Sequence, residues 1–477
     1  MKRILFPLML LAAVLVSCTK DFEEFNTDPK KPSVVPGNFL FTNAQKAFAD
    51  QEASANINEN VFKLWTQYIT QTEYIDESNY NIVKRTVANL TFRTYYRDVL
   101  RDLKEAKKVI ATEEVLTDAQ KGEKANRLLV IDVMECMVWA NLVEIFGNVP
   151  YTQALDESNV TPVYDDAKTI YVDLLAKLTN AVSELDPSRS AFASADLYMS
   201  GSTAGWIKLA NALKIRIGVI LADAEPEIAK QAVETAVAAG TFIGNEGCAM
   251  PYLTGTNSNP IYQDLVMSGR NDFVPTSPFV DLMNSLDDPR RAAYLTQLDG
   301  AYVGGAVGEL NDFDAASHVG DLFIEPTFPV TLCDYTEVAF NLAIAAEHGF
   351  SVGKSAAEYY TEAIANSMDS YGISATDKEA YLAKPEVVYA TAPGTWKEKI
   401  GRQAWIAYYF RGLTAWTSIR LLDAPVLTPA PNGVVSSLPV RFTYPINEQT
   451  LNRTNYQAAA SAIGGDLLTT KLFWDKY

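Results

Sequence analysis

Residue types that commonly act in catalysis are scarce in this sequence. Its 477 residues include two histidines, His318 and His348, and four cysteines. There is no HExxH motif and no paired CxxC, so the usual signatures of zinc sites are missing. His348 stands before Gly349 at the end of a predicted helix, where a histidine commonly stabilises the last carbonyl groups. We therefore expect no catalytic residue, no metal site and no cofactor, and neither a zinc hydrolase nor an esterase.

One segment imitates a phosphate-binding loop. Residues 349–355 read Gly-Phe-Ser-Val-Gly-Lys-Ser, with three residues between the glycines where the nucleotide-binding loop has four. The segment also follows a predicted helix, whereas the phosphate loop follows a buried strand that directs its amides at the phosphate. We interpret Gly349 as the residue that ends one helix and Ser355 as the N-cap of the next. Nucleotide is therefore not an expected ligand.

Acidic residues gather in two short segments, 287–290 and 311–314, which contain Asp287, Asp288, Asp312 and Asp314. Glycoside hydrolysis needs two carboxylates held at a fixed separation across the sugar, one of them with a raised pKa. Neither segment carries a local signature of that arrangement. We interpret them as solvated loop carboxylates, with a calcium site or a sugar contact as the alternatives.

Aromatic side chains are the more informative feature, with 7 Trp, 24 Tyr and 21 Phe. The apolar faces of sugars stack on aromatic rings, while amides and carboxylates bind the hydroxyl groups, so a neutral glycan site needs both kinds of residue. Residues 65–74 and 257–273 supply that mixture. For any one ring, packing in the core is the competing explanation. The predicted ligand-binding residues are Trp65, Tyr68, Tyr74, Asn259, Tyr262, Arg270 and Asp272.

Helical periodicity dominates the chain that must position these residues. Capping-box spacing at Asp334 with Glu337, and at Ser355 with Glu358, marks two helix starts. These two helices resemble one tetratricopeptide-type hairpin, although no strict period of about 34 residues is present. We therefore predict a mainly α fold of degenerate tetratricopeptide-like hairpins, an α-α superhelix. Helices are predicted near 42–52, 57–73, 87–111, 118–146, 165–185, 202–223, 226–239, 276–286, 334–348, 355–370, 376–383 and 396–421.

Two stretches, 241–275 and 287–333, break the helical pattern and are rich in Gly, Asn, Asp, Pro and aromatic residues. Irregular length of this kind inside a domain is usually functional, so we expect an irregular, loop-rich lobe that carries the binding site. The tail 425–454 is Pro-rich and predicted to be irregular as well. No linker divides residues 41–477, which we predict to form a single domain.

The N-terminus has the pattern of a lipoprotein signal. Lys2 and Arg3 precede an apolar run that ends in Leu-Val-Ser before Cys18. This run is shorter than the roughly 20 apolar residues that a membrane-spanning helix needs. We predict a signal peptide at residues 1–17, acylation of Cys18, and a tether at residues 18–40 that anchors the protein without crossing the membrane. An ordinary secretory signal with an incidental cysteine is the alternative.

Charge and cysteine usage exclude further classes. The net charge is −18 and no basic cluster occurs, so nucleic acid is not an expected partner. Apart from Cys18, three widely spaced cysteines remain, an odd number that argues against a disulfide framework. Cys136 lies within an apolar helix and is interpreted as a small core residue.

A series of motifs resembles the SusD/RagB family of outer-membrane lipoproteins, and most closely its SusD-like type two branch. The motifs follow one another in order over nearly the whole chain after Cys18, although Asn148 stands where the family more often has Asp. Most of them end or pack helices and therefore identify a fold and not a ligand site. They occupy residues 25–29, 40–44, 145–155, 206–216, 288–290, 300–304, 337–349, 360–373, 403–407, 415–420, 441–445, 455–456 and 473–475.

This resemblance implies a helical scaffold with an irregular lobe and no catalytic residue. It implies a lipid-anchored protein of the outer membrane, facing the cell exterior, that captures oligosaccharides or, in some members, peptides. The implied partner is a SusC-like TonB-dependent transporter that receives the nutrient. A peptide or other non-glycan ligand is the first alternative; a structural adaptor without a ligand and a surface glycosidase are the others.

Overall fold

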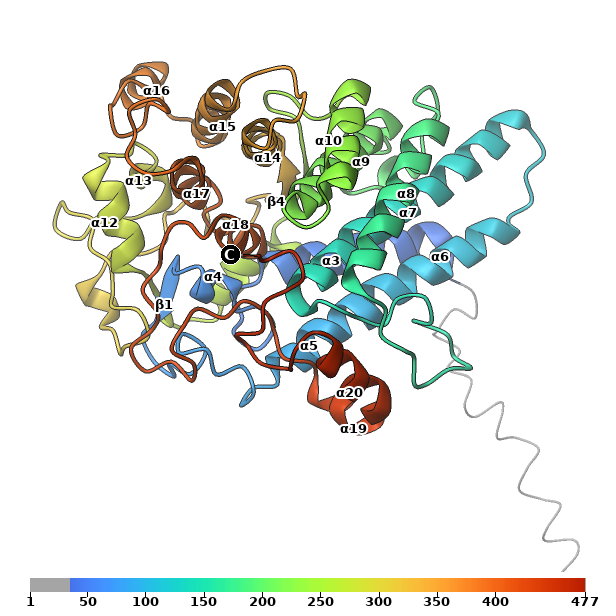
Figure 1. Cartoon of the computed structure of the whole chain (residues 1–477), viewed down its shortest axis with the longest axis horizontal. Helices are drawn as coiled ribbons and strands as arrows, with labels where there is room; N and C mark the ends of the chain where they lie inside the picture. Colours follow the sequence, from blue (N-terminus) through green and yellow to red (C-terminus); the bar gives the residue numbers. More distant parts are fainter. Residues whose placement is uncertain (1–34, 477) are drawn as a thin grey trace, which may run out of the picture.

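A computed structural model describes residues 35–476 of the chain (Figure 1). The predicted signal peptide and Cys18 lie outside the described residues. Among residues 35–476, no helix is long and apolar enough to span a membrane.

Helices fill the first half of the fold, and most pack against the next helix in the sequence. The longest of them lie side by side on the right of Figure 1. They are α3 (Gly37–Ala53), α4 (Phe62–Trp65), α5 (Val87–Arg93), a π-helix η1 (Thr94–Leu100), α6 (Arg101–Thr112), α7 (Asp118–Phe146), α8 (Ala167–Glu184), α9 (Thr203–Leu221) and α10 (Pro226–Ala239), with a short 3₁₀ helix η2 (Ala193–Ala195).

The second half adds further helical hairpins, and the chain ends with two small helices. They are α12 (Ser277–Ser285), α13 (Arg291–Tyr294), α14 (Tyr335–Glu347), α15 (Ala356–Ser370), α16 (Ala375–Leu382), α17 (Trp396–Ala407), α18 (Gly412–Leu422), α19 (Ile446–Leu451) and α20 (Arg453–Ala462). The hairpin predicted from the two capping boxes is confirmed: α14 and α15 pack together, and Ala343 and Ala363 are fully buried. The mainly α fold class is therefore confirmed.

Short irregular elements cross this helical body. They are η3 (Gly255–Asn257), α11 (Pro260–Tyr262), a π-helix η4 (Gln263–Met267), η5 (Phe313–Ala315) and two antiparallel strand pairs, β1 (Ile69–Gln71) with β3 (Phe273–Pro275) and β2 (Gly247–Met250) with β4 (Val330–Asp334). Most of these elements come from the two stretches that break the helical pattern. Residues 241–275 and 287–333 therefore form largely irregular structure, as predicted.

Several helix ends follow the local chemistry of the sequence. Ser355 and Glu358 form a reciprocal capping box at the start of α15. Gly349 and Gly372 have positive φ after α14 and α15, as expected for residues that end a helix. The Asn148 side chain accepts the Ala167 amide at 2.9 Å, so it keeps the acceptor role that the more usual Asp would have.

Residues 349–353 also have the Gly-x-Ser-x-Gly spacing of a serine-esterase nucleophile turn. That turn needs a strand before it and a helix after it. Here the segment connects α14 to α15, and the Ser351 amide donates to Glu234 on a neighbouring helix at 2.7 Å. The same placement excludes the phosphate-loop interpretation, so the resemblance to either motif is incidental.

Four predictions of local structure are wrong. The tail predicted to be irregular at 425–454 contains the helix α19, at Ile446–Leu451. The helix predicted at 57–73 covers only Phe62–Trp65, because the chain turns at Gln67 (φ 55°) and then enters the β1–β3 ladder. The tether predicted to extend to residue 40 ends earlier, because α3 begins at Gly37, where a Cβ would lie 2.6 Å from Ile110 on α6. The helix predicted at 396–421 divides into α17 and α18 around Phe410, whose φ is 66°.

Buried charges connect helices that are far apart in the sequence. Arg216 on α9 donates to Glu144 on α7 at 2.6 Å, and its other terminal nitrogen lies 3.8 Å from Glu337 on α14. Arg411, just before α18, pairs with Glu337 and, at 2.8 Å, with Asp334. Helices from both halves of the chain are thereby joined through one network of ion pairs.

The aromatic and cysteine residues of the helical motifs are part of the core. The indole nitrogens of Trp405 and Trp416 donate to the carbonyls of Thr66 and Pro439, and Arg420 donates to the carbonyl of Glu144 near the end of α7. Cys136 is buried, and its burial raises the pKa of the thiol. These motif residues therefore hold helices together, as the sequence indicates.

The prediction that Asp288 is a solvated loop carboxylate is wrong. Both Asp288 and Arg290 are completely buried, and their side chains form an ion pair at 2.6 Å. Asp287, its neighbour, has a 74% exposed side chain and pairs with Arg291 and Lys384 at the surface. The Asp-Pro-Arg motif therefore has a structural role inside the helical body.

We expect the Asp288→Asn variant to lose about 3–5 kcal/mol of unfolding free energy, because it leaves the Arg290 guanidinium buried without a counter-charge. Urea denaturation followed by circular dichroism measures the loss. Asp287→Asn is the matched control, and its loss should stay below about 1 kcal/mol because the pair is at the surface. Equal losses in the two variants would contradict the assignment.

Candidate functional site

The β1–β3 ladder brings two separate loops together. Gln71 pairs with Phe273, and beyond the strands the Thr72 amide donates to the Asp272 carbonyl at 2.9 Å. The Thr72 hydroxyl donates to the carbonyl of Asn271 at 2.6 Å. The loop after β1 and the loop before β3 therefore run side by side, and Tyr74 and Arg270 are held on the same side of the molecule.

These loops and the turn after α3 enclose a groove with a volume of about 540 Å³. A volume of this size lies in the range of sites that bind small ligands, roughly 300–1,000 Å³. The groove wall combines one exposed phenol ring with amide, carboxylate and guanidinium groups. The lining residues are Ala55, Asn56, Ile57, Asn58, Gln71, Glu73, Tyr74, Arg85, Asp264, Ser268, Arg270, Asp272 and Phe273.

Tyr74 is the aromatic residue that projects at the rim of this groove. Its side chain is 59% exposed, and its backbone has φ 53°, in the left-handed region. An aromatic residue rarely adopts that conformation, because it costs about 1–2 kcal/mol. The Gln71 side chain and the Asp76 amide both donate to the Tyr74 carbonyl, at 2.8 and 2.9 Å. The surrounding contacts thus hold an exposed ring in a strained position, a feature that is common at ligand sites.

The loop that carries Tyr74 is fixed from below by a buried carboxylate. Glu77 is completely buried and lies 2.8 Å from Arg85, and Gln71 donates to it at 3.0 Å. The carbonyl of Glu77 accepts the indole N–H of Trp65. Glu77 therefore links Gln71, before the Tyr74 turn, and Arg85, after it, to the buried Trp65.

The opposite wall is formed by the π-helix η4 and the loop after it. Asp264 accepts the Ala55 amide at 2.8 Å and the Ser54 hydroxyl at 3.1 Å, so it ties η4 to the end of α3. Burial raises the pKa of the Asp264 carboxyl. π-Helical turns are frequent at functional sites, and this one positions Asp264 and Ser268 in the groove.

The arginines of the groove are both neutralised within the protein. Asp272 binds Arg270 and raises the pKa of its guanidinium, and Glu77 pairs with Arg85. The groove therefore does not offer an unpaired cation to an anionic ligand. Its other polar groups include the exposed Glu73 carboxylate and the side chains of Asn56 and Asn58, which are joined by a hydrogen bond at 2.8 Å. Together with the Tyr74 ring, these groups suit a neutral, hydroxyl-rich ligand.

The structure brings together three of the seven predicted ligand-binding residues: Tyr74, Arg270 and Asp272. Tyr262 is half-buried and does not line the groove. Asn56 and Asn58 are not among the predicted residues, yet both line the wall. The sequence offered little signal for them, because the helix predicted at 57–73 includes Asn58.

The other three predicted residues belong to the core in this structure. Trp65 and Tyr68 are at most 1% exposed, and the Tyr68 hydroxyl donates to the Trp405 carbonyl at 2.6 Å. Asn259 is fully buried, accepts the Ile261 amide and donates to the Phe328 carbonyl. Their polar atoms are used inside the fold, and their position indicates a structural role.

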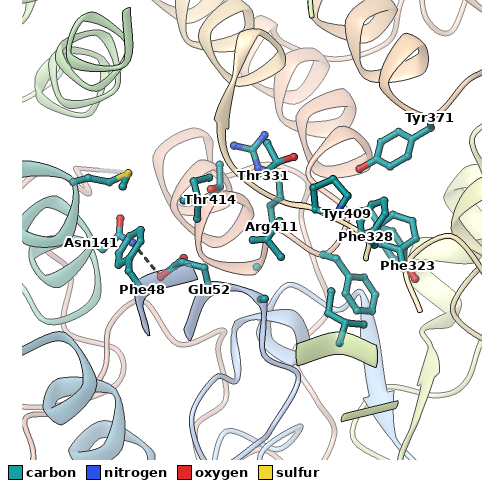
Figure 2. Close-up of a pocket in the computed structure, with 18 of the residues that line it drawn as sticks. Phe48, Glu52, Asn141, Phe323, Phe328, Thr331, Tyr371, Tyr409, Arg411 and Thr414 are labelled. Carbon is teal, nitrogen blue, oxygen red and sulfur yellow. Dashed lines mark hydrogen bonds between the residues drawn. The ribbon is translucent and has the colours of Figure 1, made fainter. Parts of the chain in front are cut away.

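A second cavity lies in the interior, where the buried ion pairs meet (Figure 2). Figure 2 shows Glu52, Asn141 and Arg411 around it, together with the rings of Phe323 and Phe328. Its volume is about 60 Å³, which has room for a few ordered waters but not for a sugar ring. Burial raises the pKa of Glu52 and lowers that of Lys63 to about 8. This cavity is part of the buried polar network and not the candidate ligand site.

Within the described part of the chain, no group of three His, Cys, Asp or Glu side chains is placed to hold a metal ion. Asp312 and Asp314, the second acidic pair, are on the surface, where Asp312 accepts the Asp314 amide at 3.0 Å. The groove of residues 54–58, 71–85 and 264–273 is therefore the candidate site.

Comparison with known proteins identifies relatives of the whole fold. A family profile described as "SusD-like_2: Starch-binding associating with outer membrane" matches residues 29–445. A solved chitin-binding protein has a TM-score of 0.80 and 25% identity, covering 92% of this chain and 100% of its own. No curated protein sequence matches the chain.

Two further solved structures share the fold. A SusD homolog from Bacteroides uniformis has a TM-score of 0.80 and 24% identity over 92% of this chain and 99% of its own. A chitin-binding SusD homolog from Flavobacterium johnsoniae has a TM-score of 0.78 and 20% identity over 92% and 98%.

If Tyr74 is strained, Tyr74→Gly should have an unfolding free energy about 1 kcal/mol higher than Tyr74→Ala, because only glycine adopts positive φ without steric cost. Both variants remove the ring, so alanine controls for lost contacts. Urea denaturation of the two proteins in parallel measures the difference. Equal stabilities would show that the loop relaxes and stores no strain.

Proposed function

The chain belongs to the SusD-like_2 family of outer-membrane-associated binding proteins, a non-catalytic family, and on that premise we propose that it captures neutral oligosaccharides at the cell surface. The captured ligand is passed to a SusC-like TonB-dependent transporter in the same membrane. Oligosaccharides bind in the groove at Tyr74, where the sugar ring stacks on the phenol and the surrounding amides and carboxylates bind hydroxyl groups.

The observation that carries this proposal is the exposed Tyr74 ring, fixed in a strained backbone at the rim of a groove of about 540 Å³. An exposed aromatic ring beside amide groups matches the two needs of a sugar, a flat apolar contact and hydrogen-bond partners for its hydroxyls. The relatives named for starch and chitin bind uncharged polysaccharides, which agrees with a groove whose arginines are already paired.

A peptide ligand is the second candidate. Peptides commonly bind by adding a strand to a sheet edge. The β1–β3 ladder has only three residue pairs, and the groove is lined mainly by side chains of the adjoining loops. This short ladder has few free backbone groups to which a peptide strand could be added. The groove therefore favours a saccharide over a peptide as the ligand.

The N-terminal part of the proposal is the lipid anchor. Residues 1–17 act as a signal peptide, acylated Cys18 holds the protein in the outer membrane, and the chain from Cys18 to Pro36 is the tether. The family's association with the outer membrane supports this arrangement. With the acyl anchor at the far end of this tether, the folded part of the chain, which begins at α3, could move as a single domain relative to the transporter.

The Tyr74→Ala, Asp272→Ala double variant should bind the cognate oligosaccharide at least about tenfold more weakly, because a lost aromatic contact and a lost hydrogen bond together remove about 1.5–3 kcal/mol. Calorimetric titration with maltohexaose, chitohexaose and a mixed tripeptide pool identifies the ligand class with the unmodified protein. The variant is then tested with whichever probe binds.

Tyr262→Ala is the matched control, since this tyrosine lies near the groove in sequence but outside its lining. Equal weakening by both variants would contradict the assignment of the groove. If only the tripeptides bind, the proposal of a saccharide ligand is wrong and the ligand is a peptide. New reducing ends after incubation with either hexasaccharide would identify the glycosidase alternative.

Cys18→Ala should release the protein from the membrane, because the acyl chains are the only proposed anchor. Fractionation of cells that produce the full chain, followed by a high-salt wash and immunoblotting, measures its distribution. A substitution in the tether, Lys20→Ala, is the control and should stay in the membrane fraction. Retention of the Cys18→Ala protein after the wash would contradict the anchor.

A further inference from the structure

Trp396 differs from the other tryptophans of the chain. All seven lie in the described residues, and Trp396 is half-buried at the first position of α17 while the remaining six are at most 6% exposed. Its ring contributes to the wall of an open hollow of about 590 Å³, separate from the groove at Tyr74. The buried six are Trp65, Trp139, Trp206, Trp405, Trp416 and Trp474.

Four helix ends form this hollow. Asp223 follows α9, His348 ends α14, Thr395 and Trp396 begin α17, and Asp423 follows α18. Figure 1 shows α14, α17 and α18 as neighbouring helices, and both α14 and α18 contact α17. Helix ends held by packing make a rigid site, because none of these residues depends on a long loop for its position.

The carboxylate of Asp223 is placed to bind hydroxyl groups. One oxygen lies 4.0 Å from the His348 ring nitrogen Nδ1, and the other lies 3.8 Å from the Lys397 ammonium. Both distances exceed those of a direct hydrogen bond. Each carboxylate oxygen therefore keeps an acceptor position that a ligand hydroxyl group can use.

The Trp396 ring lies beside these groups. The His348 and Trp396 rings form a T-shaped pair, with centroids 5.7 Å apart and planes at 78°, and the Lys397 ammonium lies over the Trp396 ring, 5.7 Å from its centroid. Thr395 and the acidic Glu398 and Asp423 complete the lining. An aromatic surface next to a carboxylate between two nitrogen donors is the set of groups that binds a pyranose with vicinal hydroxyls.

We propose that this hollow is a second saccharide-binding site, in which a pyranose packs on Trp396 and two vicinal hydroxyls bind Asp223 and its neighbours. The site is distinct from the groove. Trp405, near the other end of α17, contacts Tyr68 beside β1, so Trp396 lies at the end of the helix remote from the groove strands. On this proposal one polysaccharide chain contacts both sites, whereas a hexasaccharide bound in the groove does not reach Trp396.

The consequence is a difference between long and short ligands. Two linked contacts raise the affinity for a chain that spans them, by about 10²–10⁴-fold in favourable cases. Trp396→Ala should therefore weaken binding of soluble amylopectin or glycol chitin by at least about tenfold, and change the affinity of the matching hexasaccharide at the groove by less than about twofold. Affinity electrophoresis measures the polymers and calorimetry measures the hexasaccharides.

Tryptophan fluorescence tests the site directly. Because the other six indoles are buried, acrylamide quenching reports mainly on Trp396. The test uses the Tyr74→Ala, Asp272→Ala protein, because its groove is disabled. The hexasaccharide that binds the unmodified protein, at millimolar concentration, should protect the Trp396 fluorescence of this variant from quenching. Trp396→Phe should abolish the protected signal while retaining an aromatic ring and the fold, as checked by the unfolding midpoint.

The outcomes separate the two sites. Unchanged polymer affinity in a folded Trp396→Ala protein, or quenching that no saccharide alters, overturns the second site. The Trp396→Ala protein could lose all saccharide binding while the Tyr74→Ala, Asp272→Ala protein binds as well as the unmodified protein. That result supports the hollow at Trp396 and overturns the groove as the main binding site. If both variants bind saccharides more weakly, and Trp396→Ala weakens polymer binding more than hexasaccharide binding, both sites are supported.

Discussion

The buried ion pairs around Glu337 are the interaction on which the rest of the structure depends. Arg216 joins Glu144 to Glu337, and Arg411 joins Glu337 to Asp334, so α7, α9, α14 and the start of α18 meet at one point. Burial raises the pKa of Glu337, and the two arginines oppose that effect. Since an unpaired charge here would cost several kcal/mol, these ion pairs favour the arrangement of helices that brings the partners together.

This fixed body explains why the candidate ligand residues lie where they do. The groove uses the loops around β1 and β3, and both loops are tied to the helices through Glu77 and Asp264. The hollow at Trp396 uses helix ends. In the groove a polar anchor inside the fold positions the exposed Tyr74 ring, and in the hollow a helix start positions the half-buried Trp396 ring. Rigid support reduces the entropy that would be lost when a ligand binds.

The helices could be predicted from sequence because their apolar periodicity and caps are local: α7 and α10 begin and end where the pattern places them. The site could be predicted only in part. A break in the helical pattern indicated Arg270 and Asp272, and the mixture of aromatic and amide residues at 65–74 indicated Tyr74. Composition cannot tell an exposed ring from a buried one. Trp65 is buried because Trp416 and Phe442 from the far end of the chain cover it. Trp396 was not among the predicted ligand-binding residues, because it begins a regular helix. The burial of Asp288 was not predicted, because its ion pair with Arg290 becomes buried only when the chain folds.

The two proposed sites on one rigid body would suit a protein that releases the ligands it binds. A deep enclosed pocket would bind tightly and exchange slowly, because affinity differences arise mainly in the rate of dissociation. Both the groove and the hollow are open, and each offers one aromatic ring. A short ligand would therefore leave quickly, while a long chain stays held as long as one contact persists. If both proposed sites bind the polymer, the distance between the two rings, and not the affinity of either site, would determine how long a polymer stays bound.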